Sequence, residues 1–381
     1  MIIIAFICCL SLAYLLFAWV CMERFHRTRT NVPLSPDFHP PVSILKPVCG
    51  LGTEMNENLR SFCDQDYPEF QVVFGLRDEN DPAVAVIRKI MEDYPDRDIT
   101  LVTDQRLHGN NYKVSNLINM FPHAKHGILV IADDDMRVSS DYLNTIVAPL
   151  ADDRTGAVTC LYSGSPRGGL MSTLNAMFVN EWFLPSALIS LALKNNEFCF
   201  GATMVIKREI LEQTGGLDAL VDYLADDYIL GKLVAEQGYR IRLSHFVVKN
   251  IINEPDFKSL LLHELRWART MRTVQPLAYT FTFLTDTLVA GSLVAVTVFF
   301  ATHLLMWPVA IICSILLLRI LFHLRVKTIL DAREAGTIWL VPARDFLTFF
   351  IRLVCFIGNK VEWKDNSFSV DNSGLIYNPA E

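Results

Sequence analysis

The densest group of acidic residues in the chain is Asp133, Asp134 and Asp135, which follow directly on the apolar run GILVIA. Carboxylates this close repel one another, so the group costs stability unless a cation is shared. Asp133 and Asp135 are two residues apart and can point to the same side of an extended chain. Both can then reach one Mg²⁺ or Mn²⁺ ion that carries a diphosphate. The alternative interpretation is a solvated acidic turn.

A further carboxylate, Asp78, also follows an apolar run, FQVVFGL. If this run and GILVIA are parallel strands, Asp78 and Asp133 belong to one crevice, because the carboxyl ends of such strands open onto the same edge of a sheet. The alternative is local, since residues 78–82, DENDP, are typical of a turn that leads into a helix.

The third acidic group is the pair Asp226 and Asp227 in LADDYILGKLVAEQG. Both precede a helical run, where a carboxylate is stabilised by the helix dipole without any further role. The functional interpretation is that Asp227 is a general base, placed to take the proton of a hydroxyl as its oxygen attacks.

Three basic segments accompany these acids: Lys46 at the end of VSILKPV, Lys113 in LHGNNYKVSN, and the stretch HELRWARTMR. Either lysine can pair with a phosphate or nucleotide, and either can equally be a surface charge. In the third segment, His263 and Arg266 share a helix face, and arginine offers planar donors suited to phosphate oxygens. The alternative is a positively charged anchor beside the apolar run that follows.

The elements that must position these residues lie between about Pro40 and Asn253. Short apolar runs typical of strands (VSILKPV, FQVVFGL, ITLVT, GILVIA, AVTCLY) alternate with segments of helical periodicity. Such alternation predicts an α/β domain whose mainly parallel sheet is covered on both faces. No G-x-G-x-x-G or G-x-x-x-x-G-K-[ST] motif follows a strand, which argues against nicotinamide dinucleotide and P-loop sites.

Two regions of the chain are apolar enough for a membrane. Residues 2–21 are uncharged and long enough to span, and we expect a retained transmembrane helix over 1–23 rather than a cleaved signal peptide. Residues 276–326 have room for two further spans. Basic residues follow the first span and flank the pair, which predicts a cytoplasmic domain over residues 40–272.

The segment 337–363 is also apolar but contains Arg344, Asp345 and Arg352. These charges argue against a free span. They favour an amphipathic segment that lies in the membrane interface or re-enters the cytoplasmic leaflet.

Composition narrows the function further. The net charge of −7 gives no reason to expect nucleic acid as a partner. The nine cysteines form no C-x-x-C pair and no zinc-like grouping, so we expect mostly buried thiols in a reducing compartment.

The order of Asp78, ADDDM, LADDY and H-x-x-R-W resembles the signature of membrane-bound family 2-like glycosyltransferases, and in particular the ceramide glucosyltransferase family. RLHGNNYKVSNLINM, CFGATM and HELRWARTMR look like its bacterial branch associated with hopanoid biosynthesis. The resemblance extends from about residue 41 to 364. One departure is His263, which stands where the wider family has Gln or Arg.

This resemblance implies a GT-A fold and metal-dependent, inverting transfer of a hexose, glucose or N-acetylglucosamine, from a UDP-sugar to a lipid hydroxyl. By position, Asp78 contacts the uridine, and Asp133 with Asp135 holds Mg²⁺ or Mn²⁺ and the diphosphate. Asp227 is the base, and Arg266 with Trp267 braces the diphosphate and lines the acceptor site.

Lys46, Lys113 and His263 complete the residues expected to contact the donor. The implied location is the inner membrane of a bacterium, with the catalytic domain in the cytoplasm and a ceramide or hopanoid-type lipid as acceptor. Three alternatives stay open: a processive polysaccharide synthase, a two-metal phosphohydrolase and a non-catalytic membrane scaffold.

Overall fold

The computed structural model describes residues 2–29, 38–193, 197–332, 334, 336–363, 366–371 and 373–377. Residues 1 and 364, the ends of two ranges expected from the sequence, lie outside the described residues. The chain divides into two compact units, each assembled from separate segments. Unit 1 comprises Met1–Arg27, Gly164–Asn195 and Asn253–Ser373, and unit 2 comprises Thr28–Ser163, Asn196–Ile252 and Gly374–Glu381.

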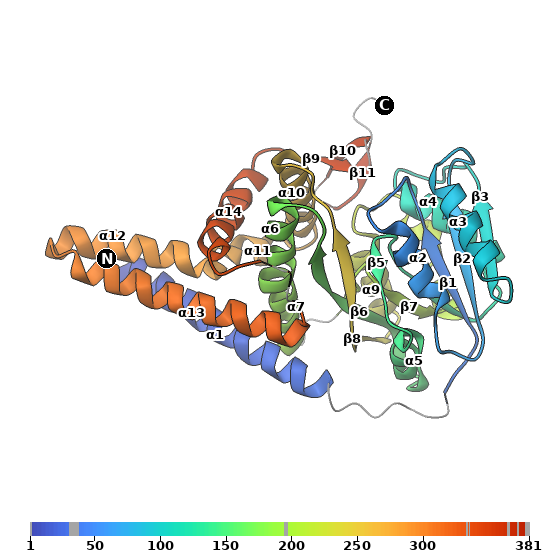
Figure 1. Ribbon diagram of the computed structural model, residues 1–381, viewed down its shortest axis with the longest axis horizontal. Helices are drawn as coiled ribbons and strands as arrows, with labels where there is room; N and C mark the ends of the chain where they lie inside the picture. Colours follow the sequence, from blue (N-terminus) through green and yellow to red (C-terminus); the bar gives the residue numbers. More distant parts are fainter. Residues whose placement is uncertain are drawn as a thin grey trace. The chain divides into compact units, whose positions relative to one another are not determined.

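Unit 2 is built on an eight-stranded sheet with the order β3-β2-β1-β4-β7-β6-β8-β5 (Figure 1). Strands β1, β2, β3 and β4 pair in parallel, while β7 pairs antiparallel with β4 and β6, and β5 antiparallel with β8. The strands are β1 Val42–Pro47, β2 Phe70–Leu76, β3 Asp98–Thr103, β4 Ile128–Ile131, β5 Met136–Arg137, β6 Thr155–Pro166, β7 Met204–Lys207 and β8 Arg240–Ile252, with the short β11 Ile376–Tyr377 near the C-terminus.

The central strands β1, β2 and β4 are buried along their whole length, because helices cover both faces of the sheet. In β1, Ile44 packs into one core cluster and the next residue, Leu45, into the other, as the alternation of strand side chains requires. The helices of unit 2 are α2 Met55–Cys63, α3 Ala83–Asp93, α4 Tyr112–Met120, η1 Phe121–His123, α5 Tyr142–Val147, η2 Ala148–Ala151, α8 Arg208–Gln213, η4 Leu217–Leu220 and α9 Asp226–Glu236.

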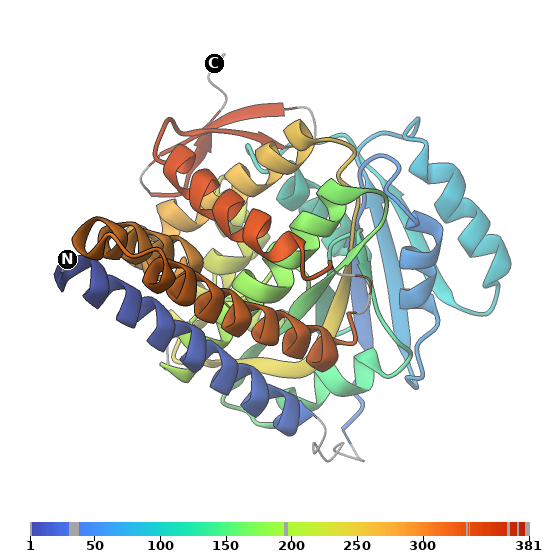
Figure 2. The ribbon, with the colours of Figure 1, turned by 60° about the vertical axis from the view of Figure 1, so that its left-hand side comes forward.

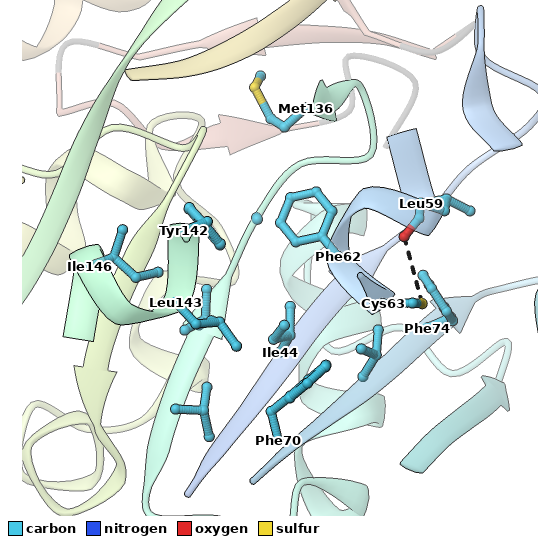
Figure 3. Close-up of a cluster of buried hydrophobic side chains, with 14 of the residues drawn as sticks. Ile44, Leu59, Phe62, Cys63, Phe70, Phe74, Met136, Tyr142, Leu143 and Ile146 are labelled. Carbon is cyan, nitrogen blue, oxygen red and sulfur yellow. Dashed lines mark hydrogen bonds between the residues drawn. The ribbon is translucent and has the colours of Figure 1, made fainter. Parts of the chain in front are cut away.

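The first core cluster lies under α2 and α5 (Figure 3). The ring of Tyr142 meets that of Phe62 edge to face at 5.5 Å, and its hydroxyl makes a 2.9 Å hydrogen bond with that of Thr203. These contacts join α2 to α5 and tie α5 to the residue that precedes β7.

Unit 1 is mostly helical. Its elements are α1 Ile2–Arg29, α6 Leu170–Phe178, the π-helical turn η3 Val179–Phe183, α7 Leu184–Ala192, α10 Phe257–Val274, α11 Pro276–Phe281, η5 Thr282–Thr285, α12 Thr287–Thr302, α13 Met306–Leu330, α14 Leu340–Cys355, β9 Lys360–Trp363 and β10 Asn366–Val370. Strands β9 and β10 form an antiparallel hairpin. Unit 1 takes in α6, η3 and α7, which fall inside residues 40–272; the domain limits expected from the sequence stay a prediction.

Helices α1, α12 and α13 run side by side in unit 1 (Figures 1 and 2), with Cys8, Leu288 and Ile315 in one apolar cluster. Within the described residues, α1 and α13 are long and apolar enough to cross a membrane. The pair formed by Pro276–Thr285 and Thr287–Thr302, bent by 56°, makes a third if it is one span.

Helix α14 has an unusual distribution of polarity. Arg344 and Arg352 are buried against the rest of unit 1, whereas Phe346, Phe350 and Leu353 are exposed. A helix whose apolar side chains point outward and whose charges point inward is suited to contact with lipid rather than with water. This is the segment for which the sequence predicts an interfacial element.

Candidate active site

The site residues of unit 2 gather where the parallel strands end. Since β1, β2 and β4 are parallel, their carboxyl ends open onto the same edge of the sheet. Lys46 is the last residue but one of β1, Asp78 is two residues beyond β2, and Asp133 is two residues beyond β4. The common edge inferred from the apolar runs is therefore present in the structure.

Lys46 is fully buried. Its ammonium group donates to the backbone carbonyl of Asp133 and lies 3.7 Å from the centre of the Phe62 ring. Burial lowers the pKa of Lys46 to about 8, although the neighbouring carboxylates partly oppose the change. This lysine fixes the start of the acidic loop; contact with a donor substrate stays a prediction for it.

Lys113, in the first turn of α4, is the cation at the centre of the acidic groups. Its Nζ lies 2.9 Å from Asp133 Oδ1 and 3.1 Å from Asp226 Oδ2. Burial by itself would lower the pKa of Lys113, but the two carboxylates outweigh it and raise the pKa. The lysine therefore stays charged and joins the loop after β4 to the start of α9.

Asp227 is held by two backbone N–H groups. Gly201 N donates to Oδ2 at 2.7 Å, and Tyr228 N donates to Oδ1 at 2.8 Å. A side chain at position 201 would place its Cβ 3.1 Å from Asp133 Oδ2 and 3.4 Å from Asp227 Oδ2. Gly201 therefore lies between the two carboxylates, and its lack of a side chain keeps the space between them open.

The surroundings of Asp227 tune its acidity. Burial raises its pKa to about 6 and Asp226 adds to the rise, while Lys113 and the two N–H groups oppose it. A carboxylate with a pKa near the working pH is an effective general base, because it is ionised at neutral pH and still accepts a proton readily.

The two carboxylate oxygens of Asp135 have different surroundings. Oδ2 accepts from Asn250 Nδ2 at 2.8 Å, whereas the buried Oδ1 has no hydrogen-bond partner among the described residues. Burial raises the pKa of Asp135 to about 7, with Asp134 and Asp133 adding to the effect. An unpaired buried carboxylate oxygen is costly and is what a bound cation would satisfy.

No group of three His, Cys, Asp or Glu side chains in the described part of the chain is arranged to hold a metal by itself. Mg²⁺ is usually bound in proteins by one or two carboxylates together with the phosphates of a substrate. The unpaired oxygen of Asp135 and the carboxylate of Asp133 therefore fit such an ion.

Asp78 is exposed, and its Oδ1 accepts from Asn80 N at 2.9 Å. The local turn considered for this segment is thus present, although Asp81 rather than Asp78 accepts from the first residue of the next helix, Ala83 N, at 2.8 Å. The same turn leaves Asp78 at the carboxyl edge of the sheet, and its contact with uridine stays a prediction.

The H-x-x-R-W residues belong to α10 of unit 1. His263 Nδ1 makes a 2.6 Å hydrogen bond with Glu254 Oε1, and its ring meets that of Trp267 at 4.3 Å. Trp267 in turn stacks on Phe178, with 6.0 Å between ring centres. Arg266 is partly buried on the same helix. His263 therefore has a structural partner that no spacing rule could identify.

The last two arginines of HELRWARTMR cap another helix. Arg269 donates to the carbonyl of Ile357 at 3.0 Å, and Arg272 donates to those of Cys355 and Gly358 at 2.6 and 3.2 Å. Cationic side chains at a helix C-terminus satisfy its unpaired carbonyls and complement its dipole. These two arginines fix the end of α14.

The structure thus brings together Lys113, Asp133 and Asp227 of the expected residues in unit 2, and His263 with Trp267 in unit 1. The structure adds three residues to which sequence reasoning assigned no role in the site. Asp226 and Gly201 were visible only as part of the quoted motifs LADDY and CFGATM. Asn250, on β8, carries no signal in its sequence surroundings.

Comparison with known proteins agrees with these features. The family model of glycosyl transferase family 21 matches residues 3–376. Ceramide glucosyltransferase 3 of Caenorhabditis elegans is 23% identical over 98% of this chain and 81% of its own length. The ceramide glucosyltransferase of Komagataella phaffii is 32% identical over 39% of this chain and 29% of its own.

Among solved structures, a mannosyltransferase from Pyrobaculum calidifontis in complex with GDP-Man and Mn²⁺ aligns with a TM-score of 0.49 and 20% identity, covering 91% of this chain and 92% of that one. The family match over nearly the whole chain confirms the resemblance to ceramide glucosyltransferases. It also confirms the expected fold class, an α/β domain of the GT-A type with apolar helices. The chain is a glycosyltransferase and belongs to glycosyl transferase family 21.

Proposed function

We propose that this glycosyltransferase moves a hexose, glucose or N-acetylglucosamine, from a UDP-sugar to the hydroxyl of a ceramide or hopanoid-type lipid, with inversion at the anomeric carbon. We place it in the inner membrane of a bacterium, with the reaction at the cytoplasmic leaflet. The observation that carries the proposal is the convergence of Asp133, Asp227 and Lys113 around Gly201 at the carboxyl edge of the sheet.

In this reaction Asp227 accepts the proton of the lipid hydroxyl while the hydroxyl oxygen bonds to the anomeric carbon. The bond from that carbon to the diphosphate oxygen breaks, and UDP leaves. The two N–H donors that hold Asp227 fix its carboxylate for this transfer. A single displacement assisted by one base inverts the anomeric carbon.

Asp133 and Asp135 would hold the Mg²⁺ or Mn²⁺ ion, which when bound supplies positive charge opposite the leaving diphosphate. Lys113 balances the carboxylates and keeps Asp133 oriented. The roles of Arg266 and Trp267 toward diphosphate and acceptor, and of Asp78 toward the nucleotide, rest on the sequence match. Lys46 is included for its position at the end of β1, and His263 for its position in the H-x-x-R-W motif, where it departs from the wider family.

The test is transfer in membranes. Membranes that contain the protein are incubated with labelled UDP-glucose or UDP-N-acetylglucosamine and with ceramide, a hopanoid polyol or diacylglycerol, and the products are identified by mass spectrometry. We expect one glycosylated lipid of inverted configuration and an equimolar amount of UDP. The transfer activity should be lost on chelation with EDTA and restored by Mn²⁺ or Mg²⁺.

The matched variants are Asp227→Asn and Asp218→Asn. Removal of a general base is expected to lower kcat by roughly 10²–10⁴-fold, whereas Asp218 is exposed on η4 and its variant should match the wild type. Unchanged transfer by Asp227→Asn overturns the base assignment. Release of inorganic phosphate instead of UDP would favour a phosphohydrolase, and a polymeric product a polysaccharide synthase.

A further inference from the structure

His263 and Glu254 form a hydrogen-bonded pair that lies wholly within unit 1. His263 is on α10, and Glu254 belongs to the chain between β8 and α10. Helices α6 and α14 both pack against α10 (Figures 1 and 2). The bond joins His263 Nδ1 to Glu254 Oε1 at 2.6 Å. Glu254 lies outside the H-x-x-R-W motif, so its contact with the motif is visible only in the structure.

Glu254 is buried, and its carboxylate is held by several donors. Its side chain is only 5% exposed. Besides His263, it accepts from the hydroxyl of Ser259 and, at 3.4 Å, from Asn175 Nδ2. Its backbone N–H donates to Ser172 Oγ at 2.8 Å. These partners come from α10 and α6, and together they fix the position of the carboxylate.

The negative charge of Glu254 requires a positive partner. In the described part of the chain no lysine or arginine forms an ion pair with it, whereas Glu264, next to His263 in sequence, is paired with Arg344 at 2.7 and 2.9 Å. An ionised carboxylate that is buried without a cation is costly. A proton on each ring nitrogen makes His263 cationic and supplies the missing charge.

The ring of His263 is fixed on two sides. Glu254 holds Nδ1, and the ring of Trp267, one turn later on α10, meets the imidazole at 4.3 Å and 65°. Trp267 is itself stacked on Phe178 of α6. A carboxylate bonded to one ring nitrogen sets the protonation and the direction of the other. The direction of Nε2 is thus determined by the fold of unit 1.

Nε2 of His263 is the atom of the pair that is open to a ligand. It makes no hydrogen bond with the described residues, and it is not enclosed by the fold, since the side chain of His263 is 28% exposed. When it carries a proton, Nε2 can only donate. A charged N–H donor that faces outward matches an anionic oxygen better than a neutral one.

This arrangement accounts for the departure of the motif from the wider family. Gln or Arg, which the wider family has in place of His263, carries N–H donors that do not depend on a neighbouring carboxylate. A neutral histidine bonded through Nδ1 would instead present a lone pair at Nε2, which a phosphate oxygen repels. Glu254 is the residue of this chain that keeps a donor at the position.

We propose that Glu254 is a positioning residue, which holds His263 as a cation whose Nε2–H donates to the diphosphate of the sugar donor. The inference rests on the proposed function, which assigns the H-x-x-R-W motif to the diphosphate and the acceptor. The hydrogen bond strengthens as negative charge builds up on the leaving UDP, without transfer of the proton. Its effect therefore falls on kcat rather than on binding of the lipid.

The first measurement is spectroscopic and needs no activity. The full chain, with isotope-labelled histidine, is studied in lipid bilayers by solid-state NMR at neutral pH, and the signals of His263 are identified by their loss in His263→Arg. We expect both ring nitrogens to be protonated in the wild type and only one in Glu254→Gln, because the amide removes the charge and keeps the shape. A neutral His263 in the wild type, or a cationic one in both proteins, overturns the proposal.

The same spectra test the ligand. Addition of UDP should shift the Nε2 signal of His263 more than the Nδ1 signal, because Nδ1 is already bonded to Glu254. An unchanged Nε2 signal at saturating UDP would overturn the diphosphate as the partner of His263.

The second measurement is rescue by arginine, which is cationic without a carboxylate beside it. Glu254→Gln is expected to lower kcat by roughly ten- to hundredfold, with the KM for the lipid unchanged. His263→Arg should be active, and the double variant Glu254→Gln/His263→Arg should match its kcat within about twofold. If Glu254 only supports the fold through Ser259 and Asn175, the double variant is as impaired as Glu254→Gln, and the proposal is overturned.

Glu212→Gln is the matched control, because Glu212 is exposed on α8 and the same change there should leave kcat at the wild-type value. Thermal unfolding is measured for every variant. If Glu254→Gln does not fold, the charge of His263 in the wild type and its response to UDP decide the proposal. A cationic His263 that responds to UDP, in a chain that transfers no sugar to any lipid, would instead count against the proposed reaction and support the role of Glu254.

Discussion

Asp227 shows how single contacts determine the chemistry at this site. Its two backbone donors fix the carboxylate, and burial beside Asp226 raises its pKa to about 6. The sequence identifies this residue as an acid at the start of a helix. That position alone would indicate only a carboxylate that is stabilised by the helix dipole. Its acidity depends on Gly201 and Lys113, which are distant in sequence, and so could not be predicted.

The raised pKa of Asp227 predicts the pH profile. A base works only when ionised, so kcat/KM for the lipid at saturating UDP-sugar should be level above about pH 7. Below pH 6 it should fall roughly tenfold per unit. With the usual carboxyl pKa of 3.8, the fall would begin about two units lower.

The measurement is initial rate against pH between roughly 4.5 and 8, with the fold monitored by circular dichroism at each pH. Donor binding is titrated alongside as the control, because it separates loss of the base from loss of the metal site. A level profile down to pH 5 would contradict the assignment of Asp227 as the base.

At the scale of elements, α9 must lie close to the chain that precedes Gly201. Gly231 makes this possible: a Cβ there would lie 2.4 Å from Phe198 Cα and 2.6 Å from Cys199 N. Backbone atoms cannot move away as a side-chain end can. The approach sets the distance between the first turn of α9, with Asp227, and the backbone N–H of Gly201.

Gly231→Ala is therefore expected to destabilise the protein by about 1–3 kcal/mol and to lower kcat as well, because α9 must shift from Gly201. Gly127→Ala is the matched control, since nothing lies within 4 Å of its added Cβ. Both are compared by thermal unfolding and by transfer rate. Equal stability of the two variants would show that α9 does not depend on this approach.

The elements themselves followed from the sequence better than their partners did. The alternation of apolar runs and helical segments predicts the α/β sheet, because a period of two residues and one of 3.6 are local properties. Helix α14 illustrates the limit. Its charges predict that it is no free span, but Arg344 pairs with Glu264, 80 residues away, and only the folded chain brings such partners together.

At the scale of the molecule, the orientation in the membrane is still a prediction, and the cysteines can test it. Of the nine, Cys9, Cys49 and Cys313 are exposed and the other six are buried. Cys49 follows β1 in unit 2, so with Cys9 and Cys313 replaced by serine it should react with a membrane-impermeant maleimide in inside-out vesicles and be protected in intact spheroplasts.

Leu305→Cys provides the opposite control. Leu305 is 66% exposed in the turn between α12 and α13, on the side expected to face away from the cytoplasm, so its thiol should react in spheroplasts. If Cys49 is labelled in intact spheroplasts, unit 2 does not face the cytoplasm.

The discontinuity of unit 1 also constrains how the protein is made. Translation delivers α1 first, then α6, η3 and α7 between β6 and β7, and only after residue 253 the helices that complete the unit. The buried Asn175 and Ser172 of α6 must therefore wait for Glu254, their later partner. During synthesis, the helical segment from α6 to α7 is left without its later partners in unit 1, and the sheet of unit 2 still lacks β7 and β8. A nascent chain arrested before residue 253 should consequently be a substrate for chaperones or membrane proteases, and early stop mutations should remove the protein rather than leave a soluble catalytic fragment.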